Sequence, residues 1–582
     1  MLLYNIKRMS SQIEPILVKD DILMCSDKIG FAVSKGGQNV SVQRFPATST
    51  SSTSHVYTIN VPSTNVVMSR EVLWTSTVTL TITGTPAAGE YLLPYSETSS
   101  CDVIAPFPLH QLTTNMSAQI NNTTVSNTTN QILDPILRQL EKGKLSRYNT
   151  SAPVYLDNYS DYSESFNVIN SPFSDATRAV DYNYPPRGAF SVSVSGNTVQ
   201  AEGATDVKTV LVTFTSTEAL MLSPFVYGDA EKKAPGMYGI SQINVTMTMD
   251  ALAKRAWRWI DDEIVMAANK TISNVAYSNS YLECRFLSPH PSDMLPQENL
   301  VPYQQFTNYL KTENAPLVAG ASFQTTSNNI QLSAIPDKLI CFIRDQQSNL
   351  NNTSADCYAT ITGISILFNN QSGMLSSCDI TDLYRMSLEA GSQQSFLEFK
   401  GKARFANDAD VASYGSVVGT TGSVLVLNFA EHIALNEEFY APSSIGSFNF
   451  QIQVSYTNNT KHTITPELNT LFVHSGIFSC NNGVSASYIG VLNKQQVLDA
   501  SLQVPVGKAD LARMVGGGWF DSIKAIASKA LPMIKKALPM VKNVLGQIDH
   551  PLAKKGQEAL GSLGFGATGG METGGRRRIK HL

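Results

Sequence analysis

Side chains that often do chemistry are present in this chain, but their spacing is unfavourable for catalysis. No Walker-type phosphate loop, His-Glu-x-x-His or Gly-x-Ser-x-Gly motif occurs, and Lys35-Gly-Gly37 lacks the rest of a phosphate loop. The acidic cluster Asp261-Asp-Glu263 has no neighbours in sequence that complete a metal or acid–base site, so we interpret it as a solvated helix face. We therefore predict a protein that is not an enzyme and has no cofactor and no metal site. The eight histidines are scattered without ligand spacing, at His55, His110, His290, His432, His462, His474, His550 and His581.

The cysteines also lack a recognisable pattern. They are odd in number and widely spaced, and no Cys-x-x-Cys pair occurs. Such usage is poor evidence for a disulfide framework or a zinc site, so we expect buried, reduced thiols. The seven positions are Cys25, Cys101, Cys284, Cys341, Cys357, Cys378 and Cys480.

A basic amphipathic pattern occupies the C-terminal tail, where apolar residues recur mostly at three- and four-residue steps from Trp519 to Ile548. This pattern is typical of a helix in a membrane interface, and equally of a helix that docks on the protein body or on a partner. Pro532 and Pro539 predict kinks or short segments. The residues expected at a membrane are Trp519, Phe520, Ile523, Ile526, Ile534, Val541, Lys524, Lys535 and Lys542.

The composition of the chain indicates which class of protein positions these residues. The chain has 582 residues, 43 Lys plus Arg against 47 Asp plus Glu, and only 15% charged residues. It is too apolar, at 42%, for a disordered chain, and it is not basic enough to grip nucleic acid along its length. The first ten residues lack the apolar core of a signal peptide, and no run of about 18 apolar residues exists. We therefore expect a soluble protein that is intracellular when made.

Alternation of apolar and polar residues dominates the body of the chain. Segments such as 72–83, 207–215, 243–249 and 448–454 read as half-buried strands separated by Gly, Pro, Asn, Asp and Ser. This pattern predicts an all-β fold with tandem sandwiches. The best helical pattern before the tail, residues 250–268, predicts a helix that connects two domains, with Asp250 placed to cap it.

An internal repeat supports two copies of one sandwich. Residues 121–143 and the segment 248 positions later share seven identities, where about one or two are expected from composition. In both copies an Asn-Asn pair follows a strand and precedes a helical pattern, at 130–143 and 378–391. A tandem duplication is the simplest explanation.

Several motifs are similar to those of the double jelly-roll major capsid proteins of the adenovirus hexon, virophage and Polinton/adintovirus lineage. The resemblance covers most of residues 30–500 and implies two eight-stranded jelly rolls in each chain. It also implies homotrimers that act as pseudo-hexagonal tiles of an icosahedral virion shell, with neighbouring capsomers and a minor capsid or penton protein as partners. Synthesis would be in the host cytoplasm, with nuclear assembly left open. The motifs are Gly36-Gly-Gln-Asn-Val-Ser41, Phe107-Pro-Leu-His-Gln-Leu112, Glu218-Ala-Leu-Met-Leu-Ser-Pro-Phe225, Gly236-Met-Tyr-Gly-Ile240 and Tyr440-Ala-Pro-Ser-Ser-Ile-Gly446.

The segment before the tail resembles a site for an adenovirus-type viral cysteine protease. Met514, Val515, Gly516, Gly517 and Gly518 are similar to the Met/Leu/Ile-x-Gly-Gly-x sites of such proteases, and glycines suit an extended substrate. A flexible glycine linker explains the same residues. If cleavage occurs after Gly517, it frees a tail that is able to disrupt a membrane during entry. The basic end Arg576–Lys580 fits a weak nucleic-acid contact, a nuclear import signal or a solvated terminus.

These observations divide the chain into five parts. We expect an N-terminal arm (1–29), a first jelly roll with the connecting helix (30–267), a second jelly roll (268–500), a linker (501–517) and the amphipathic tail (518–582). Two alternatives stay open: a single-jelly-roll capsid protein with a projecting domain, and a β-rich adhesin. The first predicts a basic N-terminal arm and the second a secretion signal, and neither is evident in the sequence.

Overall fold

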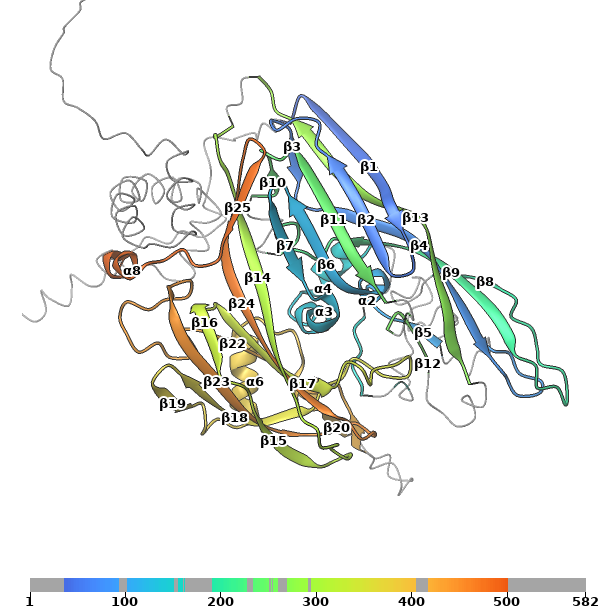
Figure 1. Cartoon of the computed structure of the whole chain (residues 1–582). Helices are drawn as coiled ribbons and strands as arrows, with labels where there is room; N and C mark the ends of the chain where they lie inside the picture. The colour runs from blue at the N-terminus through green and yellow to red at the C-terminus, as the bar shows by residue number, and fades with distance from the viewer. Residues whose placement is uncertain are drawn as a thin grey trace, which may run out of the picture. The chain divides into compact units, whose positions relative to one another are not determined.

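The protein is built mainly from antiparallel strands, in two β-sandwiches that follow one another along the chain (Figure 1). Both belong to one compact unit that ends at Leu498. The computed structural model describes residues 36–93, 102–150, 155–160, 162, 191–227, 234–250, 253, 255–259, 269–291, 295–404 and 417–500.

The first sandwich is a single sheet that folds back into two layers. Strand β1 pairs with β13 over Asn39–Pro46 and with β2 from Ala47, with a bulge between Ala47 and Ser49, so one strand serves both layers. One layer, the β4 sheet, has the order β1-β13-β4-β9-β8, and the other, the β6 sheet, has the order β2-β11-β6-β7. The elements are β1 (Asn39–Thr50), β2 (Ser54–Asn60), β3 (Val67–Ser69), β4 (Leu73–Gly84), β5 (Asp102–Ile104), α2 (Pro108–Gln111), β6 (Thr113–Ile120), β7 (Thr123–Asn127), α3 (Thr129–Leu137), α4 (Lys142–Tyr148), β8 (Ser193–Ser195), β9 (Lys208–Ala219), β10 (Gly236–Met237), β11 (Gln242–Met249), β12 (Trp257–Trp259) and β13 (Thr271–Ser288).

Sequence alternation explains how this sandwich forms its core. On β4, Trp74, Val78 and Leu80 are fully buried between the layers, while the threonines that alternate with them face outward. Burial of large apolar side chains of this kind contributes about 1.5–3 kcal/mol each. The alternation that predicted strands here is confirmed.

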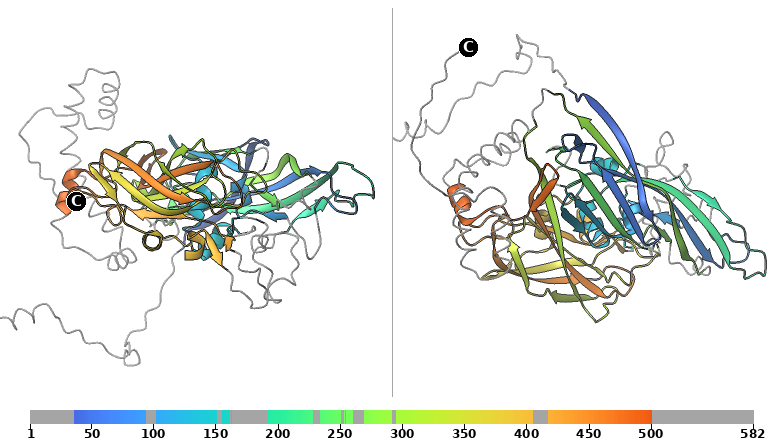
Figure 2. Two further views of the ribbon diagram at one scale, coloured as in Figure 1. Left: turned by 90° about the horizontal axis from the view of Figure 1, so that it is seen from below. Right: turned by 45° about the horizontal axis from the view of Figure 1, so that its top comes forward.

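The second sandwich has two separate sheets. The β17 sheet has the order β14-β24-β17-β22 with β25 beside β24, and the β18 sheet has the order β15-β23-β18-β19 with β16 beside β23. Figure 2 shows the strands of both sandwiches from two further sides. The elements are β14 (Asn299–Thr312), β15 (Ser322–Thr326), β16 (Ile330–Ala334), β17 (Lys338–Asp345), β18 (Thr360–Phe368), β19 (Gln371–Met374), α6 (Ile380–Glu389), α7 (Phe396–Phe399), β20 (Lys402–Arg404), β21 (Val417–Gly419), β22 (Val424–Asn428), β23 (Ile445–Thr457), β24 (Pro466–Asn481), β25 (Val484–Tyr488) and α8 (Lys494–Ala500).

The two sandwiches have the same pairing in the same chain order, so the expected duplication is confirmed. The neighbours β1-β13-β4-β9 in the first correspond to β14-β24-β17-β22 in the second. Likewise, β2-β11-β6-β7 correspond to β16-β23-β18-β19, and a helix follows β7 and β19 alike. Each sandwich is therefore a jelly roll with its strands in equivalent positions.

The repeated Asn-Asn pair makes the same turn twice. Asn121 and Asn369 both have positive φ, 51° and 53°, between the two strands of a hairpin. Each also accepts a hydrogen bond through its side-chain oxygen, from the Ser241 backbone N–H at 2.8 Å and from the Asn449 backbone N–H at 3.2 Å. Asparagine is suited to both tasks, because it tolerates the left-handed region and carries an acceptor on a short side chain.

Two expectations about the middle of the chain are wrong. The described part of residues 250–268 is not helical: Trp257–Trp259 forms β12, which pairs with β5. The boundary after residue 267 also falls inside the first jelly roll, because β13 pairs with β1 and β4 up to Ser288. The remaining residues of the expected helix, including the acidic cluster 261–263, lie outside the described residues.

The described cysteines fit the expectation of free thiols. Cys284, Cys341 and Cys480 are buried, and Cys357 and Cys378 are partly exposed. Burial raises the pKa of Cys284, Cys341 and Cys480 to about 12, so these thiols stay protonated and unreactive. Cys25 and Cys101 lie outside the described residues.

Candidate functional site: the junction between the two jelly rolls

An apolar layer joins the two jelly rolls. The outer face of the β17 sheet is buried, although it points away from the core of its own sandwich, because α3, α4 and nearby loops of the first jelly roll cover it. From the second jelly roll this layer contains Ile340, Phe342, Tyr358, Ala390, Val424, Val426, Leu471 and Val473. From the first it contains Phe107, Ile132, Leu133, Ile136, Leu137, Leu145, Tyr148, Ala219, Met221, Val226 and Tyr227.

The two jelly rolls also share a core. Val301 and Tyr303 of β14 and Phe478 and Cys480 of β24 belong to the hydrophobic core of the first jelly roll. Figure 1 shows β14 and β24 side by side, extending from the second sandwich towards β7 and β10 of the first. These strands therefore complete the first jelly roll while they form the β17 sheet of the second.

A buried arginine reinforces this shared region. The guanidinium of Arg70 donates hydrogen bonds to the backbone oxygens of Pro224 at 2.6 Å, Tyr227 at 3.0 Å and Pro302 at 2.9 Å. Arg70 is fully buried, and burial lowers its pKa to about 10. Its donors thus connect a loop of the first jelly roll to β14.

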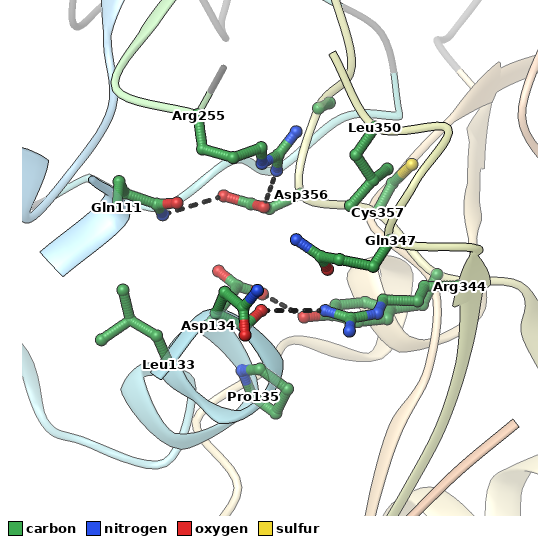
Figure 3. Close-up of a pocket in the computed structure, with 13 residues that line it drawn as sticks. Gln111, Leu133, Asp134, Pro135, Arg255, Arg344, Gln347, Leu350, Asp356 and Cys357 are labelled. Carbon is green, nitrogen blue, oxygen red and sulfur yellow. Dashed lines mark hydrogen bonds and ion pairs between the residues drawn. The ribbon is translucent and has the colours of Figure 1, made fainter. Parts of the chain in front are cut away.

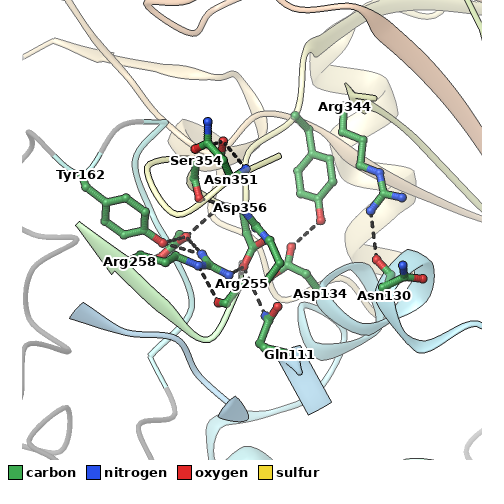
Figure 4. Close-up of polar contacts among 12 residues, drawn as sticks. Gln111, Asn130, Asp134, Tyr162, Arg255, Arg258, Arg344, Asn351, Ser354 and Asp356 are labelled. Carbon is green, nitrogen blue, oxygen red and sulfur yellow. Dashed lines mark hydrogen bonds and ion pairs between the residues drawn. The ribbon is translucent and has the colours of Figure 1, made fainter. Parts of the chain in front are cut away.

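Beside the apolar layer lies a set of charged and phenolic side chains that we call the polar junction (Figure 4). It contains three carboxylates and three guanidiniums, so its formal charges balance. Its members come from α3, from the chain after α4, from the segment around β12, and from the loop before β18. They are Asp134, Arg138, Asp157, Tyr162, Arg255, Arg258, Asp356 and Tyr358.

Asp356 is the point where the second jelly roll enters this network. One of its oxygens accepts from Arg258 Nη2 at 2.9 Å, and the other pairs with Arg255. Its backbone N–H donates to Asp157 Oδ2 at 2.8 Å. Burial by itself raises the pKa of Asp356, but Arg255 and Arg258 outweigh burial and hold it well below its usual range.

Asp134 forms the second half of the network. Arg138, which caps the C-terminal end of α3, donates through Nε to Asp134 Oδ2 at 2.7 Å, and the Tyr358 hydroxyl donates to the same oxygen. Arg138 Nη2 also donates to the backbone oxygens of Asp157 at 3.0 Å and Asp356 at 3.1 Å. Burial raises the pKa of Asp134, although Arg138 opposes this. The pKa of Tyr358 is also raised, by burial and by Asp134, so the phenol remains a donor.

The space inside the junction is small. A cavity of about 30 Å³ lies among Gln111, Asp134, Arg255, Arg344 and Asp356, as Figure 3 shows. This volume has room for no more than a few water molecules. Because the charges around it pair with one another, the arrangement is suited to holding two jelly rolls in a fixed relation.

The residues that the sequence singled out as sites lie elsewhere. Met514–Gly518 and the tail residues from Trp519 to Lys542 are outside the described residues, so cleavage and membrane contact stay predictions. Among the described residues, no helix is long and apolar enough to cross a membrane. Sequence reasoning missed the polar junction, although one signal was present: Arg258 stands between two tryptophans in a chain with few charges. An arginine in such an apolar segment points to a buried ion pair.

Comparisons with known proteins divide the chain at the same place as the fold. The family described as the first domain of the Sputnik virophage major capsid protein matches residues 11–287. The family described as the C-terminal domain of major capsid protein V20 matches residues 306–476. The interval between the two matches contains the connection from β13 to β14.

Individual relatives match this chain over nearly its whole length. The chain is 28% identical to the putative capsid protein V20 of Sputnik virophage in an alignment 593 positions long, which covers 97% of each protein. A chain of the cryo-EM structure of the Sputnik virophage has a TM-score of 0.76 and 27% identity, over 86% of this chain and 98% of that one. The crystal structure of the mavirus major capsid protein has a TM-score of 0.66 over 85% and 99%. At 14% identity, the mavirus likeness shows the fold alone.

A single jelly roll with an unrelated projecting domain does not fit two sandwiches of equivalent strand order. Two capsid families match those sandwiches in succession, and the relatives extend over both. The chain therefore belongs to the double jelly-roll major capsid proteins of the lineage that includes the virophages.

Proposed function

We propose that three copies of this chain form a pseudo-hexagonal capsomer that tiles an icosahedral shell. The observation that carries the proposal is the duplication: two jelly rolls of equivalent strand order, held by one buried junction, give a trimer six similar units. A single gene product can then occupy a mostly hexagonal lattice by closed symmetry. A low content of charged residues, 15%, limits like-charge repulsion between many packed copies.

Electron microscopy of the purified, self-assembled protein tests this function. We expect trimeric particles with a six-fold outline and larger shells or sheets built from them. A protein that remains monomeric at high concentration, or that forms tiles of another symmetry, would overturn the proposal. Because six-sided tiles alone do not form five-fold vertices, a penton or minor capsid protein is the expected partner there. We also propose synthesis in the host cytoplasm, while nuclear assembly is a second possibility supported only by the basic Arg576–Lys580.

We further propose that a viral cysteine protease cuts after Gly517 and frees a membrane-active tail. The glycine run and the basic amphipathic pattern of residues 519–548 support this, together with the family's resemblance to adenovirus proteins. Mass spectrometry of infectious particles should find a fragment that starts at Gly518. Full-length chain alone in such particles contradicts the cleavage.

The membrane step needs its own measurement. A peptide of residues 518–582 should release dye from vesicles that contain anionic lipid, because Lys524, Lys535 and Lys542 can face lipid headgroups while Trp519 and Ile534 enter the interface. The matched control replaces Trp519, Phe520 and Ile534 by serine and keeps every lysine. Equal leakage from both peptides would contradict insertion of the apolar face.

A further inference from the structure

The junction within the chain is made by two different surfaces. The first jelly roll contributes a helical surface, α3 and α4, and the second contributes the outer face of the β17 sheet. On β17 and β22 this outer face consists of directly paired residues, Ile340 with Val426 and Phe342 with Val424. A contact of this kind is heterologous, so it leaves a second helical surface and a second sheet face unused.

The unused sheet face lies on the first jelly roll. Strands β4 and β9 correspond to β17 and β22, and their outward residues include Thr77, Thr79, Leu211, Thr213 and Thr215, which we call the threonine face. Thr215 is exposed and Leu211 is 41% exposed. Thr77, Thr79 and Thr213 are half-buried, so the face is only partly covered. By contrast, the outward residues Phe342 and Val424 of the β17 sheet are buried.

The unused helical surface lies on the second jelly roll. Helix α6 corresponds to α3, and Leu388 at the end of α6 matches Leu140 in the repeat. Leu140 packs against the apolar layer of the junction, whereas Leu388 is 42% exposed. Leu397 of the neighbouring helix α7 is 53% exposed. Both leucines are exposed apolar side chains on the helical surface of α6 and α7, which we call the α6–α7 surface, and the counterpart of α6, helix α3, is packed in the junction.

We infer that the threonine face of one copy binds the α6–α7 surface of a second copy, by the same type of contact that joins the two jelly rolls within the chain. This inference rests on the proposed trimer and names the surfaces that build it. Repeating one heterologous contact from copy to copy closes a ring of three when the rotation fits. The ring then alternates contacts within chains with contacts between chains.

The chemistry of the threonine face fits a surface that is exposed first and buried later. Its hydroxyls are already paired across the strands, Thr77 with Thr215 at 2.8 Å and Thr79 with Thr213 at 2.9 Å. Covering these pairs leaves no hydroxyl without a partner, so the cost of removing them from water is small. Their methyl groups and Leu211 remain available for apolar contact. An aliphatic face like that of β17 would instead expose a large apolar patch on the separate chain.

Two arginine substitutions in the full-length chain test the inference. Thr215→Arg should block the sheet face and Leu388→Arg the helical surface, because each would place an unpaired guanidinium in the contact. We expect each variant to weaken trimerisation by at least about tenfold in light scattering and sedimentation. Controls are Thr246→Arg, at an exposed position on β11 of the other sheet, and Val484→Arg, at a side chain that is 61% exposed. Circular dichroism and melting temperature must show that all four variants are folded.

Mixing the two variants tests the head-to-tail geometry. Thr215→Arg keeps its helical surface and Leu388→Arg keeps its sheet face, so an equimolar mixture has one intact contact and should stop at a heterodimer. Variants that trimerise like wild type, or a mixture that stays monomeric, would overturn the inference while wild-type trimers still support the proposed capsomer. A wild-type chain that forms no trimer would overturn both.

Discussion

Asp356 is largely buried between two guanidiniums, and we expect its carboxylate to contribute more to the free energy of unfolding than the carboxylate of a surface ion pair. We expect Asp356→Asn to lower the free energy of unfolding by about 3–5 kcal/mol, because Arg255 and Arg258 would remain buried with too little negative charge. Urea denaturation measures the loss. The control is Glu283→Gln, which removes the pair of Glu283 with the exposed Arg44 and should cost about 0–1 kcal/mol. Equal losses for the two variants would show that the polar junction adds no more than a surface pair.

His55 gives the first jelly roll a dependence on pH. It is buried against Trp74 and Tyr277, and burial lowers its pKa from 6.5 to about 4. The folded state therefore prefers the neutral ring: its contribution is fully present above pH 6.5 and is lost as the pH falls through about 4. The difference corresponds to about 3 kcal/mol. The unfolding free energy of His55→Gln should fall less steeply than that of wild type between pH 7 and pH 4, and parallel curves would contradict this role.

The residues of the polar junction were hard to predict because their partners are remote in sequence. Arg255 and Asp356 are 101 positions apart, and Tyr358 and Asp134 are 224 apart. A charge pattern along the chain reports neighbours on one helix or strand and says nothing about such distant pairs. By contrast, Asp134 on α3 and Arg138 at its C-terminal cap are four residues apart, a spacing that a helical pattern can show.

At the scale of elements, the burial of the outer face of the β17 sheet depends on the junction. Phe342 is fully buried only because the first jelly roll covers its strand. We expect Phe342→Ala to cost about 3–5 kcal/mol, the loss typical of a large side chain removed from a core. Phe323 on β15 is 43% exposed, and Phe323→Ala should cost less than about 1 kcal/mol. Similar stabilities of the two variants would mean that the β17 sheet is not covered in solution.

Most strands can be predicted from the residues that form them, and the exceptions have physical reasons. The threonines that alternate with Val78 and Leu80 on β4 make the strand and its buried face visible in the sequence. The segment 250–268 also carries a helical pattern, but Trp257 donates to Asp102 Oδ2 at 2.7 Å and Arg258 reaches Asp157. These tertiary contacts hold Trp257–Trp259 extended against β5, and local propensity does not report them. Local propensity likewise does not report that β13 pairs with β1 and β4, so the sequence placed the end of the first jelly roll at residue 267, before β13.

At the scale of the whole molecule, the shared core predicts that the two jelly rolls unfold together. Trp74, Trp257 and Trp259 lie in the first jelly roll, and no tryptophan occurs between residues 260 and 518. Tryptophan fluorescence therefore follows mainly the first jelly roll, whereas circular dichroism follows both. We expect one thermal transition with midpoints that agree within about 2 °C, because the junction couples the two halves. A dichroism curve with two steps, only one of them seen by fluorescence, would contradict this coupling.

The sharing of β14 and β24 has a consequence for how the polypeptide is made. The interior of the N-terminal half includes Val301, Tyr303, Phe478 and Cys480, which leave the ribosome long after β1 to β13. The nascent N-terminal half therefore emerges with a gap in its packing that closes only after residue 480 has been translated. A chain released before this point would expose apolar surface of the first jelly roll, which chaperones bind and which promotes aggregation. Capsids are therefore expected to contain complete copies of the chain.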